Sequence, residues 1–152
     1  LSMISESFYC LTTSDGNFDA YSIFQKRIAE KKWPLYYQTK YQNVVKPNDG
    51  LIFYIAGINK FRQCFVASAK IKEIRRISNK TETAVDPYKL ETNVRSYIHL
   101  TDIKLFKNQI PIKSIMSNLK FIENKKKYGF YFVGGITKID KNSNNFILNQ
   151  AN

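Results

Sequence analysis

The sequence predicts an α+β fold with a small, curved, mixed or antiparallel β-sheet that closes toward a barrel, flanked by about three short helices. Two observations predict it. Strand-like and helical segments alternate irregularly along the chain, and neighbouring strand segments are joined mostly by hairpins rather than by parallel crossovers. The chain has 152 residues, 43% of them hydrophobic, which is enough for a real core. We expect a single domain over residues 1–152, either complete or as one module of a longer protein.

The first elements expected are a strand and a helix. Residues 7–13 (SFYCLTT) have strand composition, and the polar loop 14–17 after them offers several helix caps. Apolar residues then recur at steps of three and four between positions 18 and 28, which predicts an amphipathic helix. Pro34 is expected to end it.

A hairpin is expected next. The turn at residues 47–50 leads into the apolar run 51–56, and a longer strand at 61–74 follows a short connection. In this second strand small apolar residues alternate with residues that become basic, so one face leaves room above the sheet.

The second half of the chain is expected to continue with a long loop and four shorter elements. Residues 78–93 are polar without a period, and such loops are either functional or merely mobile. Strands are predicted at 95–106 and 128–136, with a bulge or close backbone approach at the glycines that end the second one. Short helices are predicted at 114–122 and 140–148.

Composition points to a polyanionic partner. Lys and Arg number 24 against 12 Asp and Glu, which gives a net charge of +12 and a pI near 9.7. Nucleic acid is the first candidate, because cations that contact phosphates supply most nonspecific affinity. No apolar run approaches a membrane span and no basic amphipathic helix appears, so no membrane attachment is expected. The basic residues expected to contact phosphates are Lys32, Lys40, Lys70, Lys72, Arg75 and Arg76.

The cysteines and the start of the chain suggest a reducing compartment. Cys10 and Cys64 lie in apolar strand-like runs and are expected to be buried free thiols. Two cysteines cannot form a disulfide framework, and no signal peptide precedes them, so a cytoplasmic location is expected.

Residues for classical catalysis are sparse. His99 is the only histidine and is expected to be structural, and there is no metal-binding or phosphate-binding motif. The enzymatic alternative is a small Mg²⁺-dependent nuclease that uses Asp102, Lys104 and Glu73, although its acids are scattered. We expect no enzyme activity, no cofactor and no metal in this chain.

Residues 33–57 combine a tryptophan, four tyrosines and two lysines. This mixture suits a pocket for a flat aromatic ligand, because aromatic faces stack on bases. The alternative is that most of these rings belong to the core.

The order of segments resembles a known family. The segments are FYCLTTSDGN, AYSIFQKRIAEKKW, NDGLIFYIAG, KFRQCFVASAKI, SYIHLTDIKLFKNQIPI and YGFYFVGGITKI. In this order, over nearly the whole chain, they resemble the EVE and YTH domains of the PUA-like superfold. The resemblance implies a module that reads a modified base in an aromatic cage, flipped from a duplex or presented in a single strand.

The resemblance also implies a target and a setting. Methylated DNA is the first target, with N6-methyladenine and 5-methylcytosine both open, and methylated RNA is the alternative. Such domains often stand at the front of modification-dependent restriction proteins of the McrB kind, beside a separate nuclease or NTPase. We expect the isolated domain to be a monomer.

Carried over by position, the resemblance makes Trp33 the main cage wall. The second wall usually comes from the strand that matches residues 97–106, where this sequence has Tyr97 and Phe106 but no tryptophan. Tyr37, Tyr54 or the 78–93 loop are the alternatives. The polar loop after the first strand is expected to reach the base edge. The predicted base-binding residues are Trp33, Tyr37, Tyr54, Ser14, Asp15, Asn17 and Tyr97.

Overall fold

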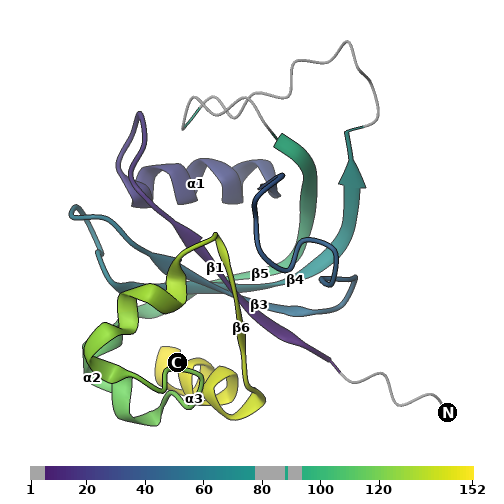
Figure 1. Cartoon of the computed structure of the whole chain (residues 1–152). Coiled ribbons are helices and arrows are strands. Elements are labelled where there is room, and N and C mark those ends of the chain that lie inside the picture. The colour runs from purple at the N-terminus through teal and green to yellow at the C-terminus, as the bar shows by residue number, and fades with distance from the viewer. Residues whose placement is uncertain (1–5, 78–87, 89–93) are drawn as a thin grey trace, which may run out of the picture.

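The computed structural model describes residues 6–77, Tyr88 and residues 94–152. Along the chain its elements are β1 (Phe8–Thr13), α1 (Ala20–Glu30), β2 (Lys32–Tyr36), β3 (Gly50–Ile55), β4 (Cys64–Arg76), β5 (Val94–Pro111), α2 (Ile112–Ile115), η1 (Met116–Asn118), η2 (Lys125–Phe132), β6 (Ile136–Ile139) and α3 (Lys141–Ala151). The strands form one mixed sheet in the order β2-β5-β4-β3-β1-β6, curled into a half-barrel (Figure 1). The predicted α+β class is confirmed.

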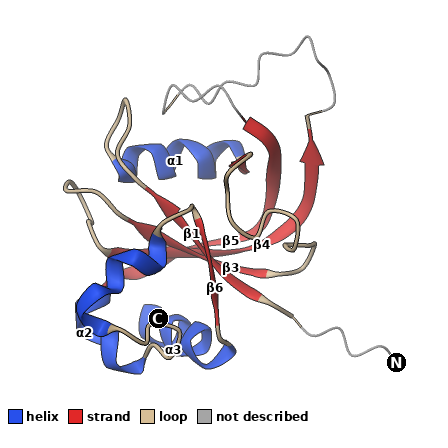
Figure 2. Cartoon of the chain, in the orientation of Figure 1, coloured by secondary structure: helices blue, strands red, loops and turns tan. Residues whose placement is uncertain are grey.

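The sheet buries both of its faces, because successive strand residues point to opposite sides. In β3, Leu51, Phe53 and Ile55 pack into one core with α1. Ile52 and Tyr54 between them face a second core that contains residues of α2, η2 and α3. Figure 2 shows α1 on one side of the sheet and α2 and α3 on the other. Strands β1 and β3, which lie inside the sheet and are covered on both sides, are therefore apolar on both faces.

The predicted hairpin forms between β3 and β4, which pair antiparallel, and β4 pairs antiparallel with β5. Among the strands that the structure describes, only β1 and β3 run parallel, with α1 and β2 in the connection between them. Cys10 and Cys64 are buried free thiols, as predicted. Burial raises the pKa of both thiols and so keeps them protonated and unreactive.

The prediction that Pro34 ends the first helix is wrong. The helix ends at Glu30, because Lys31 adopts a left-handed conformation with φ 57° and its N–H donates to the carbonyls of Arg27 and Ile28. Pro34 lies inside strand β2 instead. This strand stands at the edge of the sheet, where a residue without an N–H is tolerated.

Two predictions in the last third of the chain are also wrong. The helix expected at 114–122 is only the single turn α2 followed by η1. The strand expected at 128–136 is mostly the 3₁₀ segment η2, because Phe132 turns into the second core instead of alternating across a sheet. Strand β6 is limited to residues 136–139. Helix α3 is present, and Asp140 caps it by accepting from the Ser143 N–H at 2.9 Å.

The close backbone approach predicted at Gly134 and Gly135 is present. Both have positive φ, 97° and 85°, a region that favours glycine. The carbonyl of Gly134 accepts from the Lys40 N–H at 3.2 Å, and that of Gly135 accepts from the Thr12 N–H at 2.9 Å. The turn therefore joins η2 and β6 to the end of β1 and to the loop after β2.

Apart from Tyr88, the excursion predicted at 78–93 lies outside the described residues. Within the described part of the chain, no helix has the length and apolar character needed to cross a membrane.

Candidate functional site

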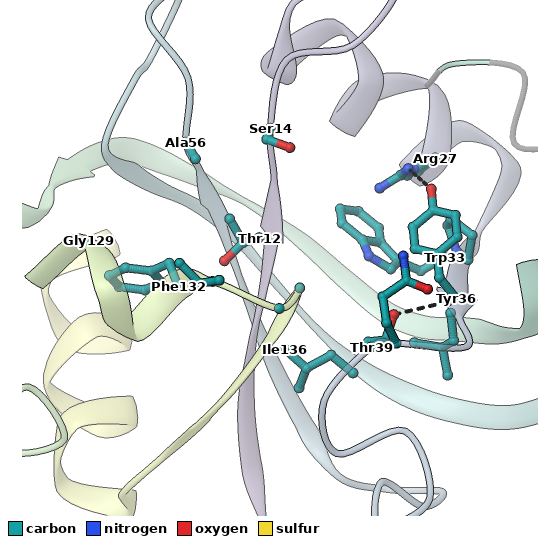
Figure 3. Close-up of a pocket in the computed structure, with 16 residues that line it drawn as sticks. Thr12, Ser14, Arg27, Trp33, Tyr36, Thr39, Ala56, Gly129, Phe132 and Ile136 are labelled. Carbon is teal, nitrogen blue, oxygen red and sulfur yellow. Dashed lines mark hydrogen bonds between the residues drawn. The ribbon is translucent and has the colours of Figure 1, made fainter. Parts of the chain in front are cut away.

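A cavity of about 440 Å³ opens where β1 and β3 end (Figure 3). Strand β2 and the loop after it form one side, and η2 with the turn that follows it forms another. The residues that line the cavity are Thr12, Ser14, Arg27, Trp33, Pro34, Leu35, Tyr36, Gln38, Thr39, Ala56, Gly129, Phe132, Val133, Gly134, Gly135 and Ile136. Its volume falls in the range of small-molecule sites.

Three aromatic rings border the cavity. Trp33 and Tyr36 come from β2, and in Figure 3 Phe132 lies across the opening from them. Phe132 is held in place by Tyr54, whose ring stacks on it with centroids 4.0 Å apart and planes 13° apart. The cavity therefore has aromatic surface on two sides, which is what a flat ligand needs.

Trp33 lines the cavity but is only 3% exposed. Its indole packs against Phe53 and Phe24, with ring centroids 5.0 and 6.5 Å away. The two alternatives raised by the sequence, core residue and cavity wall, therefore both describe this side chain. Tyr36 is half-buried and offers the more accessible ring.

Arg27 brings a positive charge to the cavity from helix α1. Its Cζ lies 4.8 Å from the centroid of the Trp33 ring, which is cation–π geometry. Its Nη2 donates to the Tyr36 hydroxyl at 3.3 Å. Arg27 is only 4% exposed, so its charge acts in a partly desolvated setting where hydrogen bonds to a ligand are strong.

Hydroxyl and amide groups complete the lining. Thr12 and Ser14 come from the end of β1, and Gln38 and Thr39 come from the loop after β2. Thr39 Oγ1 accepts from the Tyr36 N–H at 2.9 Å, which fixes that loop against the strand. Thr12 Oγ1 is buried near the Cys10 thiol, at the end of β1 that borders the cavity.

No protein-family model matches the chain, and no curated protein matches it. Solved structures do. The human THYN1 protein in complex with DNA containing 5-methylcytosine superposes with a TM-score of 0.60 at 17% identity, over 96% of this chain and 98% of that one. The N-terminal domain of Staphylothermus marinus McrB gives 0.63 at 8% identity, over 99% and 98%. The YTH domain of Zygosaccharomyces rouxii MRB1 in complex with N6-methyladenosine RNA gives 0.56 at 9% identity, over 99% and 92%.

These matches span nearly whole chains on both sides. The chain has the EVE/YTH fold of the PUA-like superfold. At identities below 20% the likeness concerns the fold, and the site has to be argued from this chain's own residues.

Two of the base-binding residues predicted for this EVE/YTH fold, Trp33 and Ser14, line the cavity. Asp15 does not line it. Its carboxylate accepts from the Ala20 N–H at 2.8 Å and from the Ile58 N–H at 3.2 Å, and so ties the start of α1 to the loop after β3. Asn17 lies outside the lining as well, and its N–H donates to the carbonyl of Tyr88.

The three tyrosines predicted for the second wall also lie outside the lining. Tyr54 is buried behind Phe132, and its burial raises the pKa of its hydroxyl. Tyr37 is 63% exposed, and the Arg95 guanidinium lies 6.0 Å from its ring centroid. Tyr97 is half-buried on β5, beneath the Lys32 ammonium. In the structure, Phe132 takes the position across from β2.

The predicted phosphate contacts are dispersed. Lys40 is exposed at the edge of the cavity, with its side chain against Gly134. Lys32 reaches Tyr97, with its Nζ 4.7 Å from the ring centroid. Lys70 is paired with Gly50, at the opposite end of β3 from the cavity. Arg75 forms an ion pair with Glu73 at 2.7 Å, and Lys72 and Arg76 are exposed on β4.

The residues of the nuclease alternative do not form a metal site. Glu73 pairs with Arg75, whereas Asp102 and Lys104 line a different cavity together with Lys70. Among the described residues, no three His, Cys, Asp or Glu side chains are grouped to hold a metal ion.

Sequence reasoning missed Arg27, Tyr36, Thr39 and Phe132 as lining residues. Arg27 lies off the apolar stripe of the helix predicted between positions 18 and 28, and Phe132 lies in the segment 128–136 that the sequence predicts as a strand. The signal for Tyr36 was present, because it lies close to Trp33 in the same aromatic stretch.

Proposed function

We propose that this chain is a binding module that recognises a modified base in nucleic acid, with methylated DNA as its first target. The base enters the cavity between β2 and η2, either flipped out of a duplex or presented by a single strand. The observation that carries the proposal is the cavity itself. It combines aromatic rings, a buried cation and several hydroxyls within a fold whose solved members include complexes with methylated DNA and methylated RNA.

Each part of the lining suits one part of a base. The rings of Trp33, Tyr36 and Phe132 offer stacking surface to its faces. Hydroxyls and the Arg27 guanidinium suit the polar edge, because a flipped base is read by hydrogen bonds to that edge. An uncharged methyl group gains from the exclusion of water, and the side chains of Leu35, Val133 and Ile136 give the cavity apolar surface for it.

DNA is favoured by the THYN1 neighbour, whose structure contains 5-methylcytosine DNA. The N-terminal domain of McrB is a further fold neighbour, and the resemblance seen in the sequence implies a setting in modification-dependent restriction. We infer a similar setting for this chain, with nuclease or NTPase activity on a separate domain or subunit. RNA is the second candidate, because the YTH neighbour holds N6-methyladenosine RNA.

A competition experiment tests the proposal. A labelled oligonucleotide with one 5-methylcytosine or one N6-methyladenine is displaced by unlabelled modified DNA, the same DNA without the methyl group, and RNA with N6-methyladenosine. The proposal predicts that one modified ligand competes at least tenfold better than its plain counterpart. Equal competition by modified and plain ligands would contradict it. The ranking of DNA against RNA decides between the two candidates.

A further inference from the structure

A second hollow, which we call the flank groove, adjoins the cavity. It measures about 310 Å³ and is lined by Lys40, Tyr41, Phe130, Tyr131, Val133 and Lys138, among others. Val133 and Ile136 line both the cavity and the flank groove. The cavity and the flank groove are therefore neighbours that share part of one wall.

Lys40 lies where the two hollows meet. Its backbone N–H donates to the Gly134 carbonyl, and its side-chain methylenes rest on Gly134 so closely that a Cβ on that glycine would lie 2.9 Å from Lys40 Cδ. Gly134 lines the cavity and Lys40 lines the groove. The path of the Lys40 side chain is therefore fixed by the turn at Gly134, which lies between the cavity and the flank groove.

The groove also exposes aromatic surface. The Phe130 ring is 69% exposed and Tyr41 is 40% exposed, although both belong to ordered segments beside the cavity. Lys138 adds a second cation from the edge strand β6. Among the described residues that line the groove, none is acidic. Exposed rings flanked by lysines are the surface on which single-stranded nucleic acids stack and neutralise their phosphates.

We propose that the flank groove binds the nucleotide next to the modified one. Lys40 contacts the phosphate that joins the two nucleotides, and Phe130 stacks on the base of the neighbour. This inference rests on the proposed function and adds to it a second subsite, so that the ligand is at least a dinucleotide rather than an isolated base. Continuity with the cavity and charge complementarity both favour this occupant.

Titration of short single-stranded ligands tests the inference. The probes are 5-methyl-2′-deoxycytidine and N6-methyl-2′-deoxyadenosine, each as the nucleoside and as the centre of a trinucleotide between two thymidines. Wild-type protein is expected to bind the preferred trinucleotide at least tenfold more tightly than its nucleoside. Lys40→Ala should weaken binding of the trinucleotide several-fold. It should also make log K fall less steeply with log salt concentration, by about 0.7, the value for one single-strand phosphate. Phe130→Ala should weaken the trinucleotide about tenfold through lost stacking.

The nucleoside is the internal control, because neither variant should change its affinity. Lys113→Ala, on α2 and in the lining of neither hollow, is the matched control for loss of one lysine and should bind like wild type. The flank groove would not be a nucleotide subsite if the nucleoside and the trinucleotide bound equally, or if both variants kept full affinity for the trinucleotide. Either result would leave the proposed function unaffected. Failure of every modified probe to outcompete its unmodified form would instead overturn the proposed function.

Discussion

At the scale of single residues, Trp33 connects the core to the cavity. Its indole is nearly inaccessible to solvent, packs on Phe24 and Phe53, and carries the Arg27 guanidinium on its ring. A change at this position therefore acts on folding and on binding together, and the two effects must be measured separately.

Trp33→Ala is expected to lower the free energy of unfolding by roughly 3–5 kcal/mol, because it empties a large packed volume. Trp33→Phe keeps an aromatic ring and should cost less. Thermal unfolding measures the stability of both, and binding of modified and plain DNA is compared for the variant that stays folded. A near-native melting temperature for Trp33→Ala would contradict the core role, and an unchanged preference for modified DNA would contradict the wall.

Tyr36 and Tyr37 form a matched pair, because they are neighbours of the same type and only Tyr36 lines the cavity. Tyr36→Ala should weaken binding of the modified base by about 1–3 kcal/mol, the usual value of one base–aromatic stack. Tyr37→Ala should change it little, since that ring is exposed beside Arg95. Titration of both variants with one modified oligonucleotide makes the comparison. A larger loss of binding for Tyr37→Ala than for Tyr36→Ala would make Tyr37 the stacking wall and would contradict binding of the base in this cavity.

At the scale of elements, helix α3 depends on its cap. Burial alone would raise the pKa of Asp140, but hydrogen bonds from the Ser143 side chain and backbone outweigh it and hold the pKa below its usual value. A lowered folded pKa means that the stabilisation is complete above the unfolded value near 3.9 and is lost as the pH falls through the folded value.

Asp140→Ala should therefore destabilise the protein by about 1 kcal/mol at pH 7 and by progressively less below about pH 4. Asp140→Asn keeps an acceptor without the titrating carboxyl and serves as its control. Denaturant unfolding at several pH values measures both. A cost of Asp140→Ala that stays constant down to pH 2.5 would show that the charged cap does not stabilise α3.

The elements that were predicted correctly have regular periods or marked boundaries. Strand β4 and helix α1 carry apolar residues at the spacing of their structure, β3 is a short apolar run after a turn, and Asp140 marks the start of α3. Segment η2 was not predictable in this way. Its aromatic run has strand composition, and only the contact of Phe132 with Tyr54 in the second core decides its path.

The candidate site was predictable only in part for the same reason. Trp33 and Ser14 line the cavity as predicted, because each lies in a short stretch whose composition is distinctive by itself. The opposite wall comes from Phe132, about a hundred positions later in the chain, and Arg27 enters from a helix position off the apolar stripe. Phe132 requires the sheet order that brings β6 beside β1, and Arg27 requires the packing of α1 against β2; no local pattern encodes either.

At the scale of the whole molecule, the charge of +12 predicts salt-sensitive binding. Log K for duplex DNA should fall against log salt concentration by about 0.9 for each phosphate neutralised. Charge reversal at Lys70 and Lys72 should lower affinity for modified and unmodified DNA alike. Lys70 pairs with the first residue of β3, roughly 20 Å along the strand from the cavity, so the preference for the modified base should persist. A flat salt response would contradict the electrostatic part of the account.

The central claim is that a modified base enters the cavity, and Trp33 reports on it directly because it is the only tryptophan and part of the lining. The decisive measurement is the fluorescence of Trp33 during titration with matched oligonucleotides that differ only in one methyl group. Entry of the modified base should give saturable quenching by the modified strand at concentrations where the plain strand causes little change. Identical curves for the two strands, or no change with either while binding is detected by another method, would contradict it.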